Sequence, residues 1–256
     1  MIDERAVVSP KAEVHADAYV GPYAIIGDDV VIGRGTRIEA HAVVKGPTTI
    51  GEDNRIFQFA SIGDDPQDKK YAGERTRLTI GHRNTIREYV TINRGTAQDR
   101  GETRIGDDNW IMAYVHIAHD CVIGNQTIFA NAATLAGHVW IDDYAILGGF
   151  SGIHQFCRIG AHAFLAAHSF ASMDVPAYVT AAGRPAEPRG VNVEGLKRRG
   201  FTAAQIRNIR DAYKIVYRQG RKIEDAIAVL AERADEQPEL EPLLETLRAS
   251  RRGVAR

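Results

Sequence analysis

The stretch Ile111–Phe156 reads IMAYVHIAHDCVIGNQTIFANAATLAGHVWIDDYAILGGFSGIHQF. An aliphatic or aromatic residue recurs in it at every sixth position, namely at Ile111, Ile117, Ile123, Phe129, Leu135, Ile141, Leu147 and Ile153. A period held this strictly indicates a stacked repeat, in which each hexad forms a short strand and a corner. The aliphatic residue of each hexad is expected to point into the core.

The same period continues in both directions from this stretch. It runs from Val8 to Ile62, resumes in phase from Ile80 to Ile92, and restarts one residue out of phase at Ile105 before it ends at Leu165. Three hexads make one coil, so the repeat predicts about eight coils of a three-sided parallel β-helix. We expect the glycines that follow the aliphatic residues to adopt the turn conformation at the corners: Gly21, Gly27, Gly33, Gly51 and Gly63.

Two polar segments interrupt the repeat, at residues 64–79 (DDPQDKKYAGERTRLT) and 93–104 (NRGTAQDRGETR). Long loops inside a compact repeat are more often functional than not. Both segments are therefore expected to lie at a functional site.

The C-terminal part of the chain changes its period. Thr202–Gln205 reads as a capping box that opens an amphipathic helix ended by Gly220, and residues 222–234 and 238–250 predict two further helices. The sequence thus predicts a mainly β protein: a β-helix domain over residues 1–189 and a small α-helical domain over residues 190–256.

The composition narrows the class of protein. Met1–Val14 has no apolar segment behind a basic start, and no run of about 18 apolar residues occurs, so neither a secretory signal nor a membrane span is expected. The two cysteines, Cys121 and Cys157, form no disulfide framework and fall at a slot otherwise filled by small or medium residues such as alanine, which predicts buried, inert thiols. A cytoplasmic protein is expected.

Four histidines gather where the hexads of three successive coils stack. The hexads that begin at Ile117, Leu135 and Ile153 are one coil apart and should share one face, about 4.8 Å from coil to coil. They carry His119, His138 and His154, with His116 just before Ile117. A column of titratable groups is a candidate site on geometric grounds.

Within this column His119 with Asp120 is the best candidate for a general base. An imidazole with a nearby carboxylate to fix its tautomer can accept a proton from a hydroxyl at neutral pH. No serine or cysteine has a convincing neighbour, which favours direct transfer over a covalent intermediate. The amide of Gly137 could donate a hydrogen bond to an oxyanion.

A metal site is the rival interpretation. His116, His119 and His138 have ligand-like spacing, and trimeric β-helices of the gamma carbonic anhydrase type bind zinc through histidines of two subunits. Asp120 and Gln155 accompany the histidines here and favour acid–base chemistry. We therefore expect neither a metal nor another cofactor.

A basic segment follows the repeat. Leu196–Lys222 contains nine lysines and arginines against one acid, Asp211. Its contiguous Lys197, Arg198 and Arg199 favour a phosphate-rich ligand or an acidic carrier protein over a merely solvated helix face. Nucleic acid is not expected, because aromatic platforms are absent and the net charge is near zero.

Several longer segments resemble a known family: QDKKYAGERT (67–76), HIAHDC (116–121), ATLAGHV (133–139), GGFSGIHQFCRIGAHAF (148–164) and GVNVEGLKRRGF (190–201). They are similar to the LpxA family of UDP-N-acetylglucosamine O-acyltransferases, the first enzymes of lipid A biosynthesis, over essentially the whole chain. The resemblance implies a cytoplasmic homotrimer of left-handed β-helices. It also implies transfer of a 3-hydroxyacyl chain from acyl carrier protein to the 3-hydroxyl of UDP-N-acetylglucosamine.

The resemblance also implies residue roles. His119 would be the base with Asp120 beside it, and the amide of Gly137 would face the thioester oxygen. The sugar and the acyl 3-hydroxyl would be held by Asp68, Lys70, His116, His138 and Gln155, with His154 nearby. The nucleotide would be held by Asn192, Glu194, Arg198 and Arg199. Acyl length would be measured near Ala167 and His168, and the basic tail helices would dock the carrier protein.

Three points stay open from the sequence. Asn93 stands where some members of the family have histidine, and neither the acyl length nor the choice between UDP-N-acetylglucosamine and its 3-amino analogue follows from the residues. A related N-acyltransferase of the same pathway has an additional N-terminal uridine-binding domain, for which the start of the hexads at Val8 leaves no room. A non-catalytic hexapeptide scaffold is the other alternative, and the histidine column argues against it.

Overall fold

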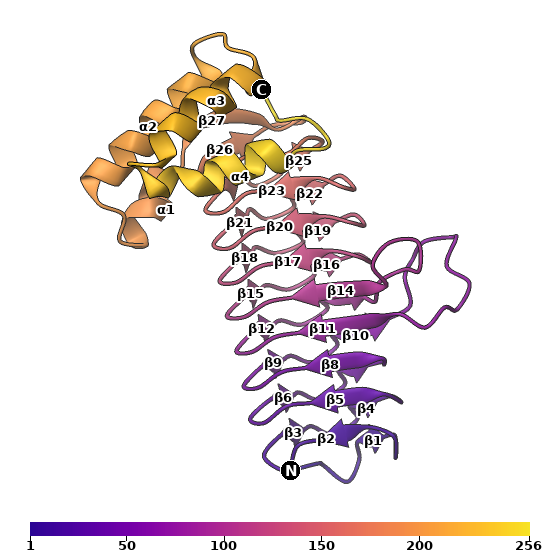
Figure 1. Cartoon of the computed structure of the whole chain (residues 1–256). Coiled ribbons are helices and arrows are strands. Elements are labelled where there is room, and N and C mark those ends of the chain that lie inside the picture. The colour runs from indigo at the N-terminus through magenta and orange to yellow at the C-terminus, as the bar shows by residue number, and fades with distance from the viewer.

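The computed structural model describes residues 1–256 and contains three flat parallel sheets wound into a left-handed β-helix (Figure 1), as predicted. The first sheet contains β1 (Val7–Val8), β4 (Ile25–Ile26), β7 (Val43–Val44), β10 (Ser61–Asp64), β13 (Thr91–Asn93), β16 (His116–Ile117), β19 (Thr134–Leu135), β22 (Gly152–Ile153) and β25 (Phe170–Ala171). The second sheet contains β2 (Glu13–Val14), β5 (Val30–Ile32), β8 (Thr48–Ile50), β11 (Arg77–Ile80), β14 (Glu102–Ile105), β17 (Val122–Ile123), β20 (Trp140–Ile141) and β23 (Arg158–Ile159).

The third sheet contains β3 (Tyr19–Val20), β6 (Arg37–Ile38), β9 (Arg55–Ile56), β12 (Thr85–Ile86), β15 (Trp110–Ile111), β18 (Ile128–Phe129), β21 (Ile146–Leu147), β24 (Phe164–Leu165), β26 (Val179–Ala182) and the antiparallel β27 (Glu187–Val191). We call the edge between the first and second sheets the first corner, the edge between the second and third sheets the second corner, and the edge between the third and first sheets the third corner.

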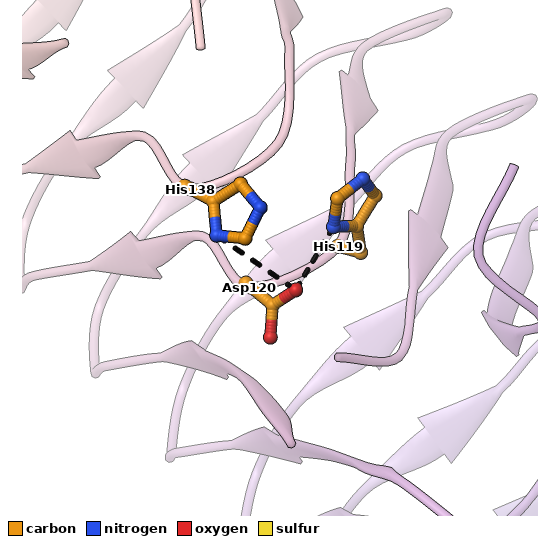
Figure 2. Close-up of side chains that lie close together, drawn as sticks. All are labelled: His119, Asp120 and His138. Carbon is orange, nitrogen blue, oxygen red and sulfur yellow. Dashed lines mark hydrogen bonds and ion pairs between the residues drawn. The ribbon is translucent and has the colours of Figure 1, made fainter. Parts of the chain in front are cut away.

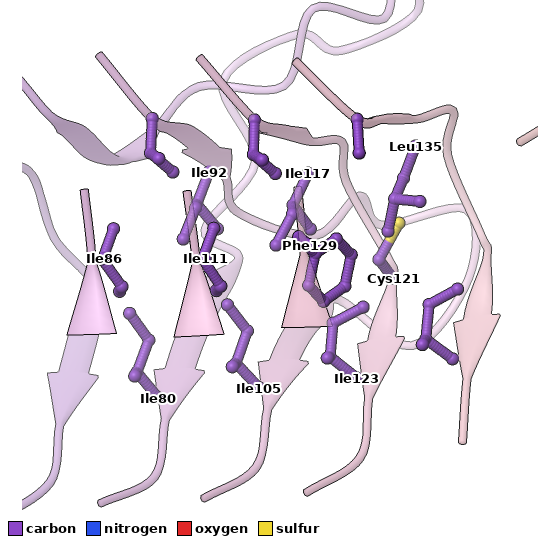
Figure 3. Packing of buried hydrophobic residues seen from close by; sticks show 14 of the residues in the cluster. Ile80, Ile86, Ile92, Ile105, Ile111, Ile117, Cys121, Ile123, Phe129 and Leu135 are labelled. Atoms are coloured by element: carbon purple, nitrogen blue, oxygen red, sulfur yellow. The ribbon is translucent and has the colours of Figure 1, made fainter. Parts of the chain in front are cut away.

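The inward residue of each hexad builds one continuous core. In Figure 3 the side chains of Ile80, Ile105 and Ile123 form one column, and those of Ile86, Ile111 and Phe129 form another. All of them are buried to 2% exposure or less. Burying one such side chain contributes about 1.5–3 kcal/mol, so the hexad spacing is itself the source of the fold's stability. Both cysteines are free and buried in this core, as predicted.

The expectation for the corner glycines is wrong at four of the five positions. The left-handed conformation occurs two residues later, at Tyr23 (φ 58°), Asp29 (φ 57°), Gly35 (φ 69°) and Asp53 (φ 55°). Of the five glycines only Gly63 has it (φ 75°). Three of the others are required by the close approach of the next coil, as at Gly33, where a β-carbon would lie 2.6 Å from the carbonyl oxygen of Gly51, whereas a β-carbon on Gly27 would meet no atom closer than 3.4 Å.

Both interrupting loops are shorter than the sequence suggested. β10 includes Asp64, and β11 begins at Arg77, so the first loop comprises residues 65–76. β13 includes Asn93 and β14 begins at Glu102, so the second comprises residues 94–101. The extra strand residues form because Asp64 of β10 pairs with Asn93 of β13, and because β11 and β14 pair over four positions, from Arg77 with Glu102 to Ile80 with Ile105. Both loops leave from the first corner and project from the same side (Figure 1).

Four helices and one 3-10 turn follow the sheets: α1 (Val193–Arg198), α2 (Ala203–Tyr217), α3 (Ile223–Ala234), η1 (Pro238–Leu240) and α4 (Glu241–Ala249). The predicted capping box between Thr202 and Gln205 is confirmed. Helix α1 was not predicted, although its N-cap Asn192, which accepts a hydrogen bond from the Gly195 amide, was a usable signal. None of the helices has the length and apolar character needed to cross a membrane.

The helices cover the C-terminal end of the β-helix, opposite the N-terminus (Figure 1). Their apolar faces share a second core with Ala177 and Tyr178 of the last coil. Tyr178 also donates a hydrogen bond of 2.7 Å to the carbonyl of Glu239. The division into domains at residues 189 and 190 stays a prediction.

Candidate active site

The predicted stacking of the histidine-bearing hexads is confirmed. β16, β19 and β22 are neighbours in the first sheet, with Ile117 in register with Leu135 and Leu135 in register with Ile153. His119 and His138 both lie at the first corner, which is also where the two loops leave the β-helix. The repeat therefore brings residues from two coils and two loops to one place.

Figure 2 shows the imidazoles of His119 and His138 beside the carboxylate of Asp120. Nδ1 of His119 lies 2.9 Å from Oδ2 of Asp120. The Asp120 side chain has 0% exposure and that of His119 has 13%. The carboxylate of Asp120 occupies Nδ1 of His119, whereas Nε2 has no hydrogen-bond partner within the chain. Nε2 is therefore the nitrogen that is free to accept a proton.

Asp120 is charged in spite of its burial. Burial raises its pKa, but hydrogen bonds from His119 and Thr96 lower it by more, so the pKa of Asp120 lies below its usual range. Thr96 donates its amide (3.0 Å) and its hydroxyl (2.6 Å) to the carboxylate. The Asp120 amide donates to Oγ1 of Thr103 at 2.8 Å. The carboxylate is thus fixed in place and ionised beside His119.

His138 packs between the base and the second loop. Its ring meets that of His119 edge to face, with centroids 5.0 Å apart, and stacks on Phe156 at 4.4 Å. Nδ1 of His138 lies 2.8 Å from Oδ2 of Asp99 and 3.9 Å from Oδ2 of Asp120. His138 is 15% exposed, and it is the one histidine of the column that lines the cleft described next.

A cleft of about 560 Å³ opens at this corner. Two of the predicted substrate residues, Asp68 and Lys70 from the first loop, line it together with His138. Asp68 also accepts a hydrogen bond of 3.0 Å from the amide of Lys70, which shapes the loop at that point. The remaining walls come from the second loop, β20, the first corner before β23, β23 itself, the segment after β25 and the C-terminal segment: Gln98, Asp99, Arg100, Trp140, Phe156, Arg158, Asp174, Ala249 and Arg251.

Several residues of this cleft were not anticipated from the sequence. Asp99 and Arg100 sit in a loop without periodic pattern, and the guanidinium of Arg100 lies 4.7 Å from the ring centroid of Trp140. Only the alignment of Trp140 and Arg158 in adjacent coils of the second sheet could have been read from the hexad spacing. No pattern in the sequence identified Thr96, because its contact with Asp120 depends on how the second loop folds back onto the β-helix.

Gly137 lies directly against the base. A β-carbon on Gly137 would come within 2.5 Å of Cε1 of His119, so any larger residue would displace the ring. Its amide donates to no group within the chain. At the same hexad slot elsewhere, the amides of Glu52 and Asp107 donate to side chains of the next coil. The Gly137 amide is therefore available to a ligand.

The other members of the column are placed differently. Nδ1 of His116 pairs with the hydroxyl of Thr91 at 2.7 Å, and burial, followed by the nearby His119, lowers the pKa of His116. Nδ1 of His154 lies 3.2 Å from the guanidinium of Arg252, away from the His119 pair. The side chain of Gln155 is exposed and makes no hydrogen bond within the chain.

The residues expected to bind nucleotide lie at the second corner. Arg199 donates to Gln126 at 3.0 Å and its guanidinium lies 4.7 Å from the ring centroid of Tyr144, whereas Arg198 makes no ion pair. Glu194 pairs with Lys197 at 2.8 Å. Asn192 caps α1 and donates to the carbonyl of His162, so both the oxygen and the nitrogen of its side-chain amide bind groups within the chain.

The residues expected to measure acyl length lie at the third corner. Ala167 is exposed, and the ring of His168 stacks on Phe150 at 5.1 Å. Within one chain, neither this pair nor the nucleotide group adjoins His119, because each occupies a different edge of the β-helix. Asn93, by contrast, lies at the base of the second loop and donates to the carbonyl of Asp65 at 2.8 Å.

One set of side chains has the make-up of a metal site. Ligand atoms of His119, Asp120 and His138 lie within 4.8 Å of one another, and two imidazoles with a carboxylate are ligands that zinc accepts. In the structure, however, the Oδ2 atom of Asp120 already accepts hydrogen bonds from Thr96 and His119. A metal would have to displace these bonds, so the set fits a hydrogen-bonded dyad better.

Comparison with known proteins identifies the family. An acyl-[acyl-carrier-protein]–UDP-N-acetylglucosamine O-acyltransferase from Janthinobacterium sp. (strain Marseille) is 58% identical over 260 residues, which cover 100% of this chain and 99% of the relative. The chain belongs to the UDP-N-acetylglucosamine O-acyltransferase family. The namesake enzyme of Stutzerimonas stutzeri (strain A1501) is 54% identical over 256 residues, with coverage of 100% and 99%.

Family models and solved structures agree with this membership. The model for domain 2 of UDP-N-acetylglucosamine O-acyltransferases matches residues 174–255, and the bacterial transferase hexapeptide model matches residues 11–46 and 102–137. The UDP-N-acetylglucosamine acyltransferase of Francisella novicida superposes with a TM-score of 0.98 at 46% identity, covering 100% of this chain and 94% of that one. LpxA from Acinetobacter baumannii superposes with a TM-score of 0.97 at 46% identity, covering 100% and 99%.

Proposed function

We propose that the protein is an acyl-[acyl-carrier-protein]–UDP-N-acetylglucosamine O-acyltransferase, which catalyses the first step of lipid A biosynthesis. It transfers a 3-hydroxyacyl chain from the thioester of acyl carrier protein to the 3-hydroxyl of UDP-N-acetylglucosamine. Family membership supports the reaction. The observation that carries the mechanism is the buried, ionised Asp120 bonded to Nδ1 of His119, which leaves Nε2 free as a base.

In the proposed reaction Nε2 of His119 removes the proton from the sugar 3-hydroxyl as the oxygen attacks the thioester carbonyl. The Asp120 carboxylate stabilises the imidazolium that forms. The amide of Gly137 donates to the oxyanion of the tetrahedral intermediate. When this collapses, the C–S bond breaks and the imidazolium returns its proton to the leaving thiolate. The products are the 3-O-acyl sugar nucleotide and the free carrier thiol, without a covalent enzyme intermediate.

The substrate-binding roles are proposed from the corner of the β-helix at which each residue lies. Asp68, Lys70 and His138 line the cleft and are proposed to hold the sugar and the acyl 3-hydroxyl, with His116, Gln155 and His154 around them. Glu194, Arg198 and Arg199, with Asn192 supporting α1, are proposed to bind the nucleotide. Ala167 and His168 are proposed to limit acyl length. No cofactor or metal takes part in this scheme.

A homotrimer is proposed because the three groups of residues occupy three corners of one chain. Packed around a threefold axis, the first corner of one subunit could meet another corner of its neighbour and complete the site. Co-expression of His119→Ala with Arg199→Ala tests this arrangement. If base and nucleotide groups come from different subunits, mixed oligomers recover part of the wild-type activity. The arrangement would be refuted if the two inactive variants stay inactive when they are co-expressed and the wild-type protein sediments as a monomer.

The exposed arginines of α2 are proposed to dock the acidic carrier protein. Arg207 and Arg210 lie on the helix surface, Arg218 is the residue that caps the helix at its C-terminus, and none of the three forms an ion pair. Reversing the charges with Arg207→Glu and Arg210→Glu should raise the KM for the acyl carrier protein, while the KM for the sugar nucleotide is retained. Added salt should raise the KM for the carrier in the same way.

The function is tested by an acyl-transfer assay with UDP-N-acetylglucosamine and a panel of 3-hydroxyacyl carrier proteins, run with and without a chelator. Wild type should form the 3-O-ester in both conditions, and His119→Ala should lower kcat by about 10²- to 10⁴-fold, the usual contribution of a general base. No ester from any donor would contradict the proposal. Transfer only to the 3-amino analogue would change the acceptor, and loss of activity with chelator would favour the metal alternative.

A further inference from the structure

The second loop is attached to the catalytic pair through Thr96. Its amide lies 3.0 and 3.1 Å from the two carboxylate oxygens of Asp120, and its hydroxyl donates to Oδ2 at 2.6 Å. Oδ2 is the same oxygen that faces Nδ1 of His119. Thr96 is 1% exposed. The hydroxyl of Thr96 and the ring of His119 therefore share one buried oxygen atom.

The first loop is attached to the second through Arg94, two residues before Thr96. Arg94 is buried, and its guanidinium donates to the carbonyl of Gly63 at 2.6 Å, to the hydroxyl of Tyr71 at 3.2 Å, and to the carboxylate of Asp65. The segment between Asp65 and Tyr71 carries the two cleft residues of that loop. The loop that lines the cleft is thus joined through the buried Arg94 to the segment that holds the carboxylate behind the base.

The hydrogen bonds of Asp120 are important because few charged groups surround its carboxylate. Besides His119 and Thr96, the groups facing it are His138 at 3.9 Å, with Asp99 beyond that ring, and the neutral thiol of the adjacent Cys121. No lysine or arginine contacts the carboxylate. Because burial favours the neutral acid, the donors from Thr96 and His119 must supply the stabilisation of the charge.

We propose that Thr96 is a positioning residue for the acyl transfer: its hydroxyl holds the Asp120 carboxylate oriented toward His119 and ties the base to the two loops at the cleft. Thr96 touches neither substrate nor the reacting atoms and acts through Asp120. The proposal rests on the proposed function only for its effect on turnover. Its structural part concerns the His119–Asp120 hydrogen bond in the free protein.

The test compares Thr96→Val, which keeps the size and the backbone donor but removes the hydroxyl, with Thr96→Ser, which restores it. Thr36→Val is the matched control, because Thr36 is equally buried and its hydroxyl donates at 2.7 Å to the carbonyl of Gly51, in the N-terminal coils. For each variant kcat, KM and the pH dependence of kcat/KM are measured with the substrates of the proposed reaction. The ring nitrogens and Nδ1 proton of His119 are followed by NMR without substrate.

Thr96→Val should lower kcat by about 10- to 100-fold, since small displacements of a catalytic group carry penalties of this size. Without the hydroxyl, burial should raise the pKa of Asp120. The carboxylate should then become protonated, and cease to support His119, at a higher pH than in wild type, so the acid limb of the pH profile should move to higher pH. Thr96→Ser should restore both values, and Thr36→Val should change neither. A loss of folding stability alone would not move the acid limb.

The proposal is overturned if Thr96→Val keeps the wild-type kcat, acid limb and His119 NMR signals, or if Thr36→Val changes them equally. If Thr96→Val proves too unstable to assay, the NMR comparison of Thr96→Ala with wild type decides, because alanine also lacks the hydroxyl and should therefore shift the Nδ1 proton signal of His119. An unchanged signal there counts against the proposal. If wild type transfers no acyl group while Thr96→Val shifts the His119 signals, the proposed function fails and the positioning role stands.

Discussion

The imidazole of His119 packs directly against the α-carbon of Gly137. A β-carbon on this glycine would come within 2.5 Å of Cε1 and 2.7 Å of Nε2 of His119. The two residues belong to consecutive coils of the first sheet. The glycine's backbone does not adopt a left-handed conformation. Space for the imidazole, and not backbone strain, is therefore what requires glycine here.

This contact predicts the effect of Gly137→Ala. The added methyl group would push the His119 ring away from the reacting hydroxyl, so we expect kcat to fall by at least about 100-fold while the melting temperature changes little. Acyl transfer and thermal unfolding are measured on the same samples. Gly27→Ala is the control, because a β-carbon there meets its nearest atom at 3.4 Å, in the N-terminal coils. Full activity in Gly137→Ala would disprove the steric role.

The two cysteines are expected to be unreactive in the folded protein. Burial raises the pKa of Cys121 to about 12 and that of Cys157 to about 11, so almost no thiolate exists at neutral pH. A disulfide reagent that absorbs light on reaction should label neither thiol within minutes in buffer and both in denaturant. Rapid labelling of the native protein would show that the core opens readily.

The hexad spacing sufficed to predict the coils because each inward slot must be filled by an apolar residue in every coil. It also sufficed to bring His119 and His138 to the same corner in adjacent coils, since the hexads that begin at Ile117 and Leu135 are stacked by the same rule. The buried cysteines follow from the same slot arithmetic. Everything that depends on the period of the repeat was therefore accessible from the sequence.

The contacts of the loops were not accessible, because no period relates them. Thr96 meets Asp120 across 24 positions and Asp99 meets His138 across 39, and both contacts depend on how an irregular segment folds back. The corner glycines were misjudged for a different physical reason. Their small size serves the spacing between coils, whereas residues with side chains such as Tyr23 and His41 adopt the left-handed turn.

The exposed position of Ala167 predicts a change of donor preference. If the acyl chain ends against this residue, Ala167→Met should favour shorter donors and Ala167→Gly longer ones. One methylene in an apolar site is worth about 0.8 kcal/mol, so blocking two of them should lower kcat/KM for the best wild-type donor by roughly 10-fold or more. The measurement is kcat/KM across a donor series that differs by two carbons. An unchanged preference in both variants would remove Ala167 from the acyl site.

His162 predicts part of the acid sensitivity of the fold. Its ring stacks between Tyr144 (4.6 Å) and Tyr178 (5.7 Å) and meets Phe201 edge to face. Burial, followed by the charge of Arg199, lowers the pKa of His162 to about 4. The unfolded chain binds this proton near pH 6.5, so the folded state loses stability as the pH falls from about 6.5 toward 4 and regains it above.

The substitution His162→Phe keeps the aromatic stack and removes the titration, and Phe150 and Phe156 show that phenylalanine accepts the same left-handed backbone conformation. We therefore expect wild type to lose more unfolding free energy than the variant between pH 7 and pH 5, measured by urea unfolding at fixed protein concentration. His41→Phe is the control: His41 is exposed when folded, so its replacement gives no reason for an altered pH dependence. Parallel stability curves for wild type and His162→Phe would mean that the buried imidazole takes up its proton without opening the stack.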